Sequence, residues 1–194
     1  LGDFNRPITT ASVEAQQWFD RGLAWIYGFD LEMAGRCFSE AIAMDKSCAM
    51  AYWGLAYASG IYYNKPWHRM QQDELTEKLQ LTYDLSREAQ VRADSVTGVE
   101  KGMIDALVFR YQSPVPVEAN SYNEWNDNYA DAMRGVYQEN PNDLDVAALF
   151  AEAMMTRTPW ALWDLVSGQP AEGASTLESI DVLERAITRI DRKK

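Results

Sequence analysis

The stretch AQQWFDRGLAWIYGFDLEMAGRCFSEAIAM, residues 15–44 of this chain of 194 residues, carries a clear helical pattern. In its first part, apolar and small residues recur at the three- and four-residue spacing of one helix face, at Ala15, Trp18, Phe19, Gly22 and Ile26. Gly28 and Asp30 interrupt the pattern, and Asp30 is of the residue type that caps a helix N-terminus. The same period then returns at Ala34, Cys37, Phe38, Ala41 and Ile42. The stretch therefore predicts two helices joined by a tight turn.

The same stretch has the spacing of a helical repeat. In a unit of about 34 residues that starts at Ala15, aromatic and small side chains occupy the positions where two helices pack, at Trp18, Gly22, Trp25, Ala34, Phe38 and Ala41. Gly22 and Ala34 would let the helices approach while the rings fill the space between them. A second unit begins at Ala49, where residues 51–56 (AYWGLA) again place an aromatic, a Leu and a small residue in register.

The second repeat unit is interrupted by an insertion. Residues 61–68 (IYYNKPWH) form this insertion, and a long helix is predicted after it, from about residue 71 to about 93. Thr97 and Glu100 form a capping box for a further helix that ends near Tyr111.

The second half of the chain repeats this organisation. Ser121 and Glu124 form another predicted capping box, and its helix runs to the turn at 140–143 (NPND). The apolar positions of that helix are Trp125, Tyr129, Met133 and Val136. A small-residue-rich helix follows and is broken at Pro159. The predicted fold is all-α, with helix pairs over 1–112 and 117–194 that continue as one solenoid domain.

The last predicted helix begins at the capping box of Ser175 and Glu178. Its apolar residues Ile180, Leu183 and Ile187 form a face that we expect a following helix to cover. We therefore expect this chain to be a portion of a longer repeat array, since arrays normally close with a polar terminal repeat.

These residues resemble the tetratricopeptide-repeat (TPR) superfamily, most closely over 18–60 and more weakly over 140–190. The longer strings at 49–58 (AMAYWGLAYA), 63–67 (YNKPW) and 143–152 (DLDVAALFAE) are similar to the divergent TPR-domain proteins of bacteria and fungi. The resemblance implies antiparallel helix pairs stacked as a right-handed solenoid. It also implies that this chain is an N-terminal portion, because later repeats of that group carry several His residues that this chain lacks.

The charge and hydropathy of the sequence exclude two classes of binding partner and one class of membrane segment. The chain carries 18 basic and 29 acidic residues, a net charge of −11, which opposes nucleic-acid phosphates and anionic lipid headgroups. No apolar run approaches the about 20 residues that span a bilayer. We expect neither a nucleic-acid nor a membrane partner. Two cysteines are typical of a reducing compartment, so we expect a cytoplasmic protein, although a removed targeting segment would leave no trace here.

Local catalytic and metal motifs are lacking in the sequence. His68 is the single histidine, and with Cys37 and Cys48 it cannot complete the tetrahedral ligand set of a structural zinc site. Three carboxylates share one predicted helix face, at Glu124, Asp127 and Asp131, and we interpret them as a solvated face rather than a cation site. We predict no metal and no cofactor, and whether the chain belongs to an enzyme stays open.

Aromatic residues in the insertions are the candidate ligand-binding residues. Trp53 to Trp67 and Val146 to Trp160 each lead, at the same spacing, into a Pro-Trp pair. If these two loops lie on one side of a solenoid they would converge, although each Trp could instead plug the end of its own helix pair. The candidates are Tyr62, Tyr63, Asn64, Trp67, His68, Trp160 and Trp163.

Three hypotheses of function follow. The first is a helical-repeat scaffold that binds a protein or peptide, or the remaining part of its own polypeptide. The second is the N-terminal part of an enzyme or ligand-binding protein, with a small ligand in an aromatic pocket completed by a metal- or cofactor-binding segment outside this chain. The third is an architectural assembly subunit.

Overall fold

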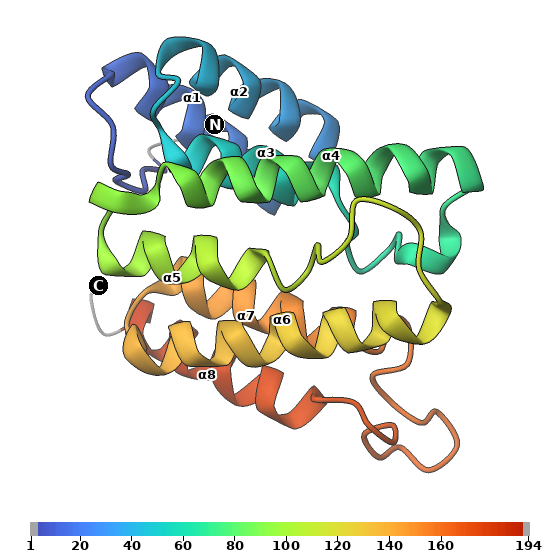
Figure 1. The fold of residues 1–194 in the computed structure, drawn as a ribbon. Helices are drawn as coiled ribbons and strands as arrows, with labels where there is room; N and C mark the ends of the chain where they lie inside the picture. The colour runs from blue at the N-terminus through green and yellow to red at the C-terminus, as the bar shows by residue number, and fades with distance from the viewer. Residues whose placement is uncertain (1–3, 192–194) are drawn as a thin grey trace. The chain divides into compact units, whose positions relative to one another are not determined.

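The computed structural model describes residues 4–191, and over these residues the chain is all-helical, with eight α-helices and no strand (Figure 1). The predicted fold class, all-α, is confirmed. None of the described helices is both long and apolar enough to cross a bilayer. The α-helices are α1 (Val13–Tyr27), α2 (Leu31–Met44), α3 (Ala49–Ser59), α4 (Gln72–Val91), α5 (Gly98–Leu107), α6 (Ala119–Glu139), α7 (Leu144–Thr156) and α8 (Thr176–Asp191), with short 3-10 helices η1 (Trp67–Arg69) and η2 (Ala93–Ser95).

The chain divides into two compact units. The first takes the chain up to Ile61 and then Gln71–Val117, and the second takes Tyr62–Met70 and the chain from Glu118 onward. The change of unit after Val117 falls next to the boundary predicted from the sequence. The Pro-Trp segment Tyr62–Met70 differs from the prediction, because it packs with the second unit rather than with the helices that precede it.

The first two helices of the first unit begin at capping side chains, Ser12 for α1 and the predicted Asp30 for α2. The Ser12 hydroxyl accepts from the Ala15 N–H at 3.1 Å, and an Asp30 carboxylate oxygen accepts from the Met33 N–H at 3.0 Å. Between α1 and α2, Phe29 adopts the left-handed conformation with φ of 59°, which reverses the chain in three residues. The predicted tight turn is confirmed, and α1 packs on α2, α2 on α3 and α3 on α4.

The Phe38 ring lies at the centre of α1, α2 and α3. A Cβ placed on Gly22 would lie 2.7 Å from this ring, and one on Gly54 would lie 2.5 Å from it, so both helices reach the ring only because these residues lack side chains. The second ring in this contact is Phe19, whose centroid is 5.5 Å from that of Phe38. Trp18, predicted at the contact of the two helices, is half-buried, and the neighbouring Phe19 takes the inward position.

The capping box of α5 is confirmed, with Thr97 and Glu100 bonded reciprocally. The helix ends at Leu107, earlier than the predicted Tyr111. The Phe109 and Arg110 N–H groups bond to carbonyls three residues back rather than four, which tightens and ends the helix.

The second unit stacks α7 between α6 and α8. The predicted apolar face of α6 is buried, at Trp125, Tyr129, Met133 and Val136. The capping box predicted at Ser121 is wrong, because α6 begins at Ala119 with Glu118 at its N-cap, which places Ser121 inside the helix. Asp143 caps α7 by accepting from the N–H groups of Asp145 and Val146, both at 3.0 Å.

Candidate functional site

The two Pro-Trp loops meet in the second unit. The Tyr63 hydroxyl oxygen accepts a hydrogen bond from the Trp160 N–H at 2.9 Å, and the two rings pack edge to face with centroids 6.2 Å apart. The Arg69 guanidinium lies over the Trp160 ring, 4.9 Å from its centroid. The predicted convergence of the loops is therefore confirmed, and the meeting point presents a cation, a phenol and an indole together.

Trp67 has a different role from Trp160. It is 3% exposed, stacks on Tyr122 with centroids 5.3 Å apart and meets Trp125 edge to face at 6.1 Å. A side chain so deeply buried offers no surface to a ligand. The prediction of Trp67 as a ligand-binding residue is corrected: it fixes Tyr62–Met70 to α6 as a core residue.

Trp160 is held in a strained backbone conformation. Its φ is 59°, which a bulky residue rarely adopts, and its side chain remains 49% exposed. Such strain costs on the order of 1–3 kcal/mol and persists only where the surroundings enforce it. Trp160 lies in a turn closed by the Ala161 N–H on the Thr158 carbonyl at 3.0 Å, and its own N–H is bound by the Tyr63 hydroxyl.

The segment from Leu162 to Ala171, between α7 and α8, is an ordered loop (Figure 1, orange to red). The Ala171 N–H donates to the Leu162 carbonyl at 3.1 Å, and Trp163 forms an isolated bridge with Pro170. Inside it, the Asp164 carboxylate accepts from the Val166 N–H at 2.9 Å, and these turn contacts hold the pKa of Asp164 below its ordinary value. The loop is therefore shaped by its own hydrogen bonds.

The loop presents apolar side chains to solvent. Leu165 is 94% exposed and Val166 is 98% exposed at its tip, and Trp163 is also exposed. We call Trp160, Trp163, Leu165 and Val166 the loop surface. Large apolar groups gathered on one segment are typical of interaction sites.

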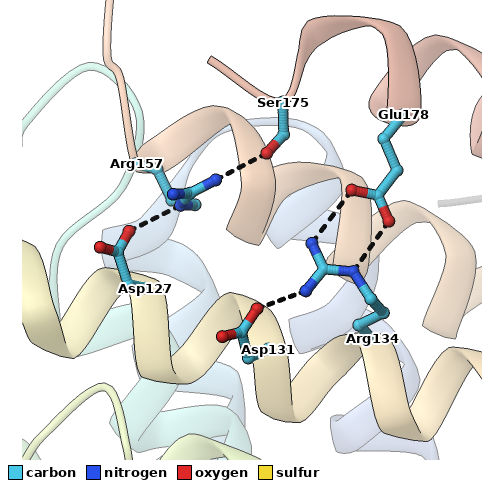
Figure 2. A network of polar contacts seen from close by, with 6 residues as sticks. All are labelled: Asp127, Asp131, Arg134, Arg157, Ser175 and Glu178. Atoms are coloured by element: carbon cyan, nitrogen blue, oxygen red, sulfur yellow. Dashed lines mark hydrogen bonds and ion pairs between the residues drawn. The ribbon is translucent and has the colours of Figure 1, made fainter. Parts of the chain in front are cut away.

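Two arginines join residues that precede this loop to residues that follow it (Figure 2). Arg157, at the end of α7, donates to Asp127 at 2.6 Å and to the Ser175 hydroxyl at 2.7 Å, so it joins the residues that precede and follow the loop. Arg134 donates to both Glu178 carboxylate oxygens, at 2.8 and 3.0 Å. The helix start predicted at Ser175 agrees with the structure, since α8 begins at Thr176, and the two residues of the predicted capping box, Ser175 and Glu178, both bind arginines.

The other sequence candidates lie around this meeting point. Asn64 and His68 are exposed, and Tyr62 is half-buried and bridged to Lys65. No described residue set brings three or more His, Cys, Asp or Glu side chains together as a metal site would. The three carboxylates predicted as a solvated face, Glu124, Asp127 and Asp131, are all exposed. Two of them also form surface ion pairs, Asp127 with Arg157 and Asp131 with Arg134.

The cysteines do not have the properties of nucleophiles. Cys37 and Cys48 are buried free thiols. Burial raises the pKa of both thiols, and that of Cys48 rises to about 11. A neutral buried thiol is unreactive at neutral pH.

Sequence reasoning missed Arg69, Arg134 and Arg157. Arg69 directly follows the candidate His68, so its place in the insertion was a usable signal. Arg134 and Arg157 bind partners far along the chain, and no local spacing marks such pairs.

Comparison of the chain with models of known families and with curated proteins gives no match.

Proposed function

We propose that this chain is a TPR-like helical-repeat scaffold that binds another protein through the loop surface. The observation that carries the proposal is the ordered loop between α7 and α8, whose two tip residues Leu165 and Val166 are almost fully exposed. An apolar pair at the tip of a hydrogen-bonded loop costs little entropy to immobilise when a partner covers it. The hydrogen bond from Arg157 to the Ser175 hydroxyl also helps to hold the loop in one conformation before a partner binds.

The packing of α1 to α3 supports the repeat assignment. The close approach around Phe38 depends on Gly22 and Gly54, which are the small residues expected at repeat positions. Stacked helix pairs of this kind carry binding loops as insertions on one side.

Photo-crosslinking tests this function. A photoreactive amino acid replaces Val166 in one variant and Val91, an exposed apolar residue of α4, in the control. We expect the Val166 variant, irradiated in its native cells, to give a discrete protein adduct that Leu165→Asp abolishes. The same adducts from both positions would contradict the proposal.

A second function is favoured by one observation, the contact of Tyr63, Arg69 and Trp160. An indole face under a guanidinium, beside a phenol, suits a flat anionic small molecule, as in a ligand pocket completed outside this chain. Metal and absorbance analysis of the protein in its native form separates this enzyme or ligand-binding function from a colourless scaffold.

A further inference from the structure

The N-terminal segment of the first unit is bound like a peptide. Residues 4–12, which we call the arm, form no helix and run back along α1 (Figure 1, dark blue). Phe4 packs edge to face on Tyr27 with centroids 5.9 Å apart, and the Asn5 amide donates to Asp20 at 2.8 Å. The arm therefore lies antiparallel to the helix that it precedes.

Side chains of α1 bind the main chain of the arm. Gln16 donates to the Arg6 carbonyl at 2.8 Å and accepts from the Ile8 N–H at 2.9 Å. Asp20 accepts from the Arg6 N–H at 2.9 Å. The residue between these contacts is Pro7, which has no N–H to satisfy and which favours an extended residue before it. The arm sequence thus matches the donors and acceptors that receive it.

Glu100 continues this recognition from α5. Glu100 is 1% exposed, and its carboxylate accepts from the Thr9 N–H at 2.6 Å and from the Thr9 hydroxyl at 2.7 Å. Burial would raise the pKa of Glu100, but hydrogen bonds from Thr9 and Thr97 outweigh it and hold the pKa below its ordinary value. The contacting carboxylate is therefore charged.

The far end of the arm meets Asp45, which accepts from the Thr10 hydroxyl at 2.5 Å. Beside it lies an open cavity of about 490 Å³, lined by arm residues 8–11 together with Asp45, Ser47, Arg92, Ser95 and Val96. The arm does not fill this space.

One arm side chain is an anchor. Arg6 is 7% exposed, and its Nη2 donates to the Met103 sulfur at 3.5 Å. Buried arginines are frequent anchors of protein interfaces. A basic ligand also suits the three carboxylates Asp20, Asp45 and Glu100 that contact the arm.

We propose that Gln16, Asp20, Asp45 and Glu100 form a binding seat for an extended Arg-Pro-x-Thr-Thr peptide of a separate protein, and that the arm occupies this seat in cis as its competitor. The tethered arm acts at an effective concentration on the order of millimolar, so it blocks a partner peptide of ordinary affinity. Displacement of the arm frees the seat and removes arm residues 8–11 from the wall of the adjoining cavity. This proposal is independent of the loop surface.

The test uses the full chain with a protease site inserted after Ala11, cleaved in the folded state. A labelled peptide of residues 4–11, FNRPITTA, is then titrated and followed by fluorescence anisotropy. We expect saturable binding that an unlabelled copy competes away and a scrambled peptide does not. Peptide with Arg6→Ala should bind at least tenfold more weakly.

Protein variants locate the binding. Gln16→Ala in the cleaved chain should weaken peptide binding about tenfold, the effect of losing about 1.4 kcal/mol. Gln17→Ala, at the exposed neighbouring position, should leave binding unchanged. Equal affinity in both variants would overturn the proposal.

A variant that needs no cleavage provides the same test if the cleaved chain unfolds. Arg6→Ala with Thr9→Ala keeps the arm tethered but weakens its hold, so this variant should bind the peptide while the unaltered chain does not. Failure of the peptide to bind a folded open-arm variant, or exchange of arms between two copies to give a dimer, would overturn the proposal. Leu165→Asp should leave peptide binding unchanged, so the peptide assay is independent of whether the loop surface binds a partner.

Discussion

Replacement of Gly22 by Ala tests the packing at the centre of the first unit. The new Cβ would lie 2.7 Å from the Phe38 ring, closer than carbon atoms pack, so the ring must move. It cannot retreat freely, because Gly54 confines it within the same contact, at 2.5 Å from a Cβ built there. Overpacking of this kind costs about 1–3 kcal/mol.

Alanine has a higher helix propensity than glycine, and this gain partly offsets the overpacking cost of Gly22→Ala. Gly to Ala inside a helix stabilises by about 0.8–1 kcal/mol, so a control with the same gain is needed. Gly35 supplies it, since a Cβ there would lie 3.7 Å from a Leu55 methyl, an ordinary contact. We expect Gly35→Ala to raise the free energy of unfolding of the first unit and Gly22→Ala to fall below it by about 1–3 kcal/mol.

Urea denaturation followed by far-UV circular dichroism measures both variants. Shortening Phe38 to Leu in the Gly22→Ala chain should recover part of the loss, because it removes the atoms that clash. Equal stabilities for Gly22→Ala and Gly35→Ala would refute the close approach of α1 to α2.

Three further outcomes are expected. Trp67→Ala should destabilise the second unit by about 3–5 kcal/mol in thermal melts. Trp160→Ala should cost only about 1–2 kcal/mol, since the exposed ring loses its contacts with Arg69 and Tyr63; equal losses would contradict the different roles of the two residues. Folding lowers the pKa of Glu100, so the ionised carboxylate stabilises the fold at pH values above its unfolded pKa of about 4.3, and this contribution is lost as the pH falls through the lower folded pKa. Glu100→Gln should therefore be less stable than the unaltered chain at neutral pH, and its stability should change less with pH under acid conditions. Cys48 should react with a thiol reagent only on unfolding, and rapid labelling of the native chain would contradict its burial.

The helices of this protein could be predicted because their signals are local. The periodic faces of α1 and α2, and caps such as Asp30 and Thr97, depend on residues within one or two turns. The capping box predicted at Ser121 and Glu124 was wrong because the same four-residue pattern also occurs inside a helix that begins earlier.

The candidate site was only partly predictable. Trp67 and Trp160 share the same Pro-Trp context, and their different burial is set by rings of α6 that meet Trp67 and leave Trp160 free of such cover. The arm was missed altogether, since an extended segment bound by side chains has no period. Its partners Gln16 and Glu100 look like ordinary helix-surface and capping residues in the sequence.

The loop surface is the proposed binding site for a partner protein. Calorimetric titration of the partner identified by crosslinking, against the chain carrying Leu165→Ser and Val166→Ser, measures what this surface contributes to binding. Burial of these two side chains should contribute about 3 kcal/mol, so the double variant should bind about 100-fold more weakly. Val91→Ser, at an exposed apolar position of α4, should bind like the unaltered chain. Unchanged affinity of the double variant would contradict the account.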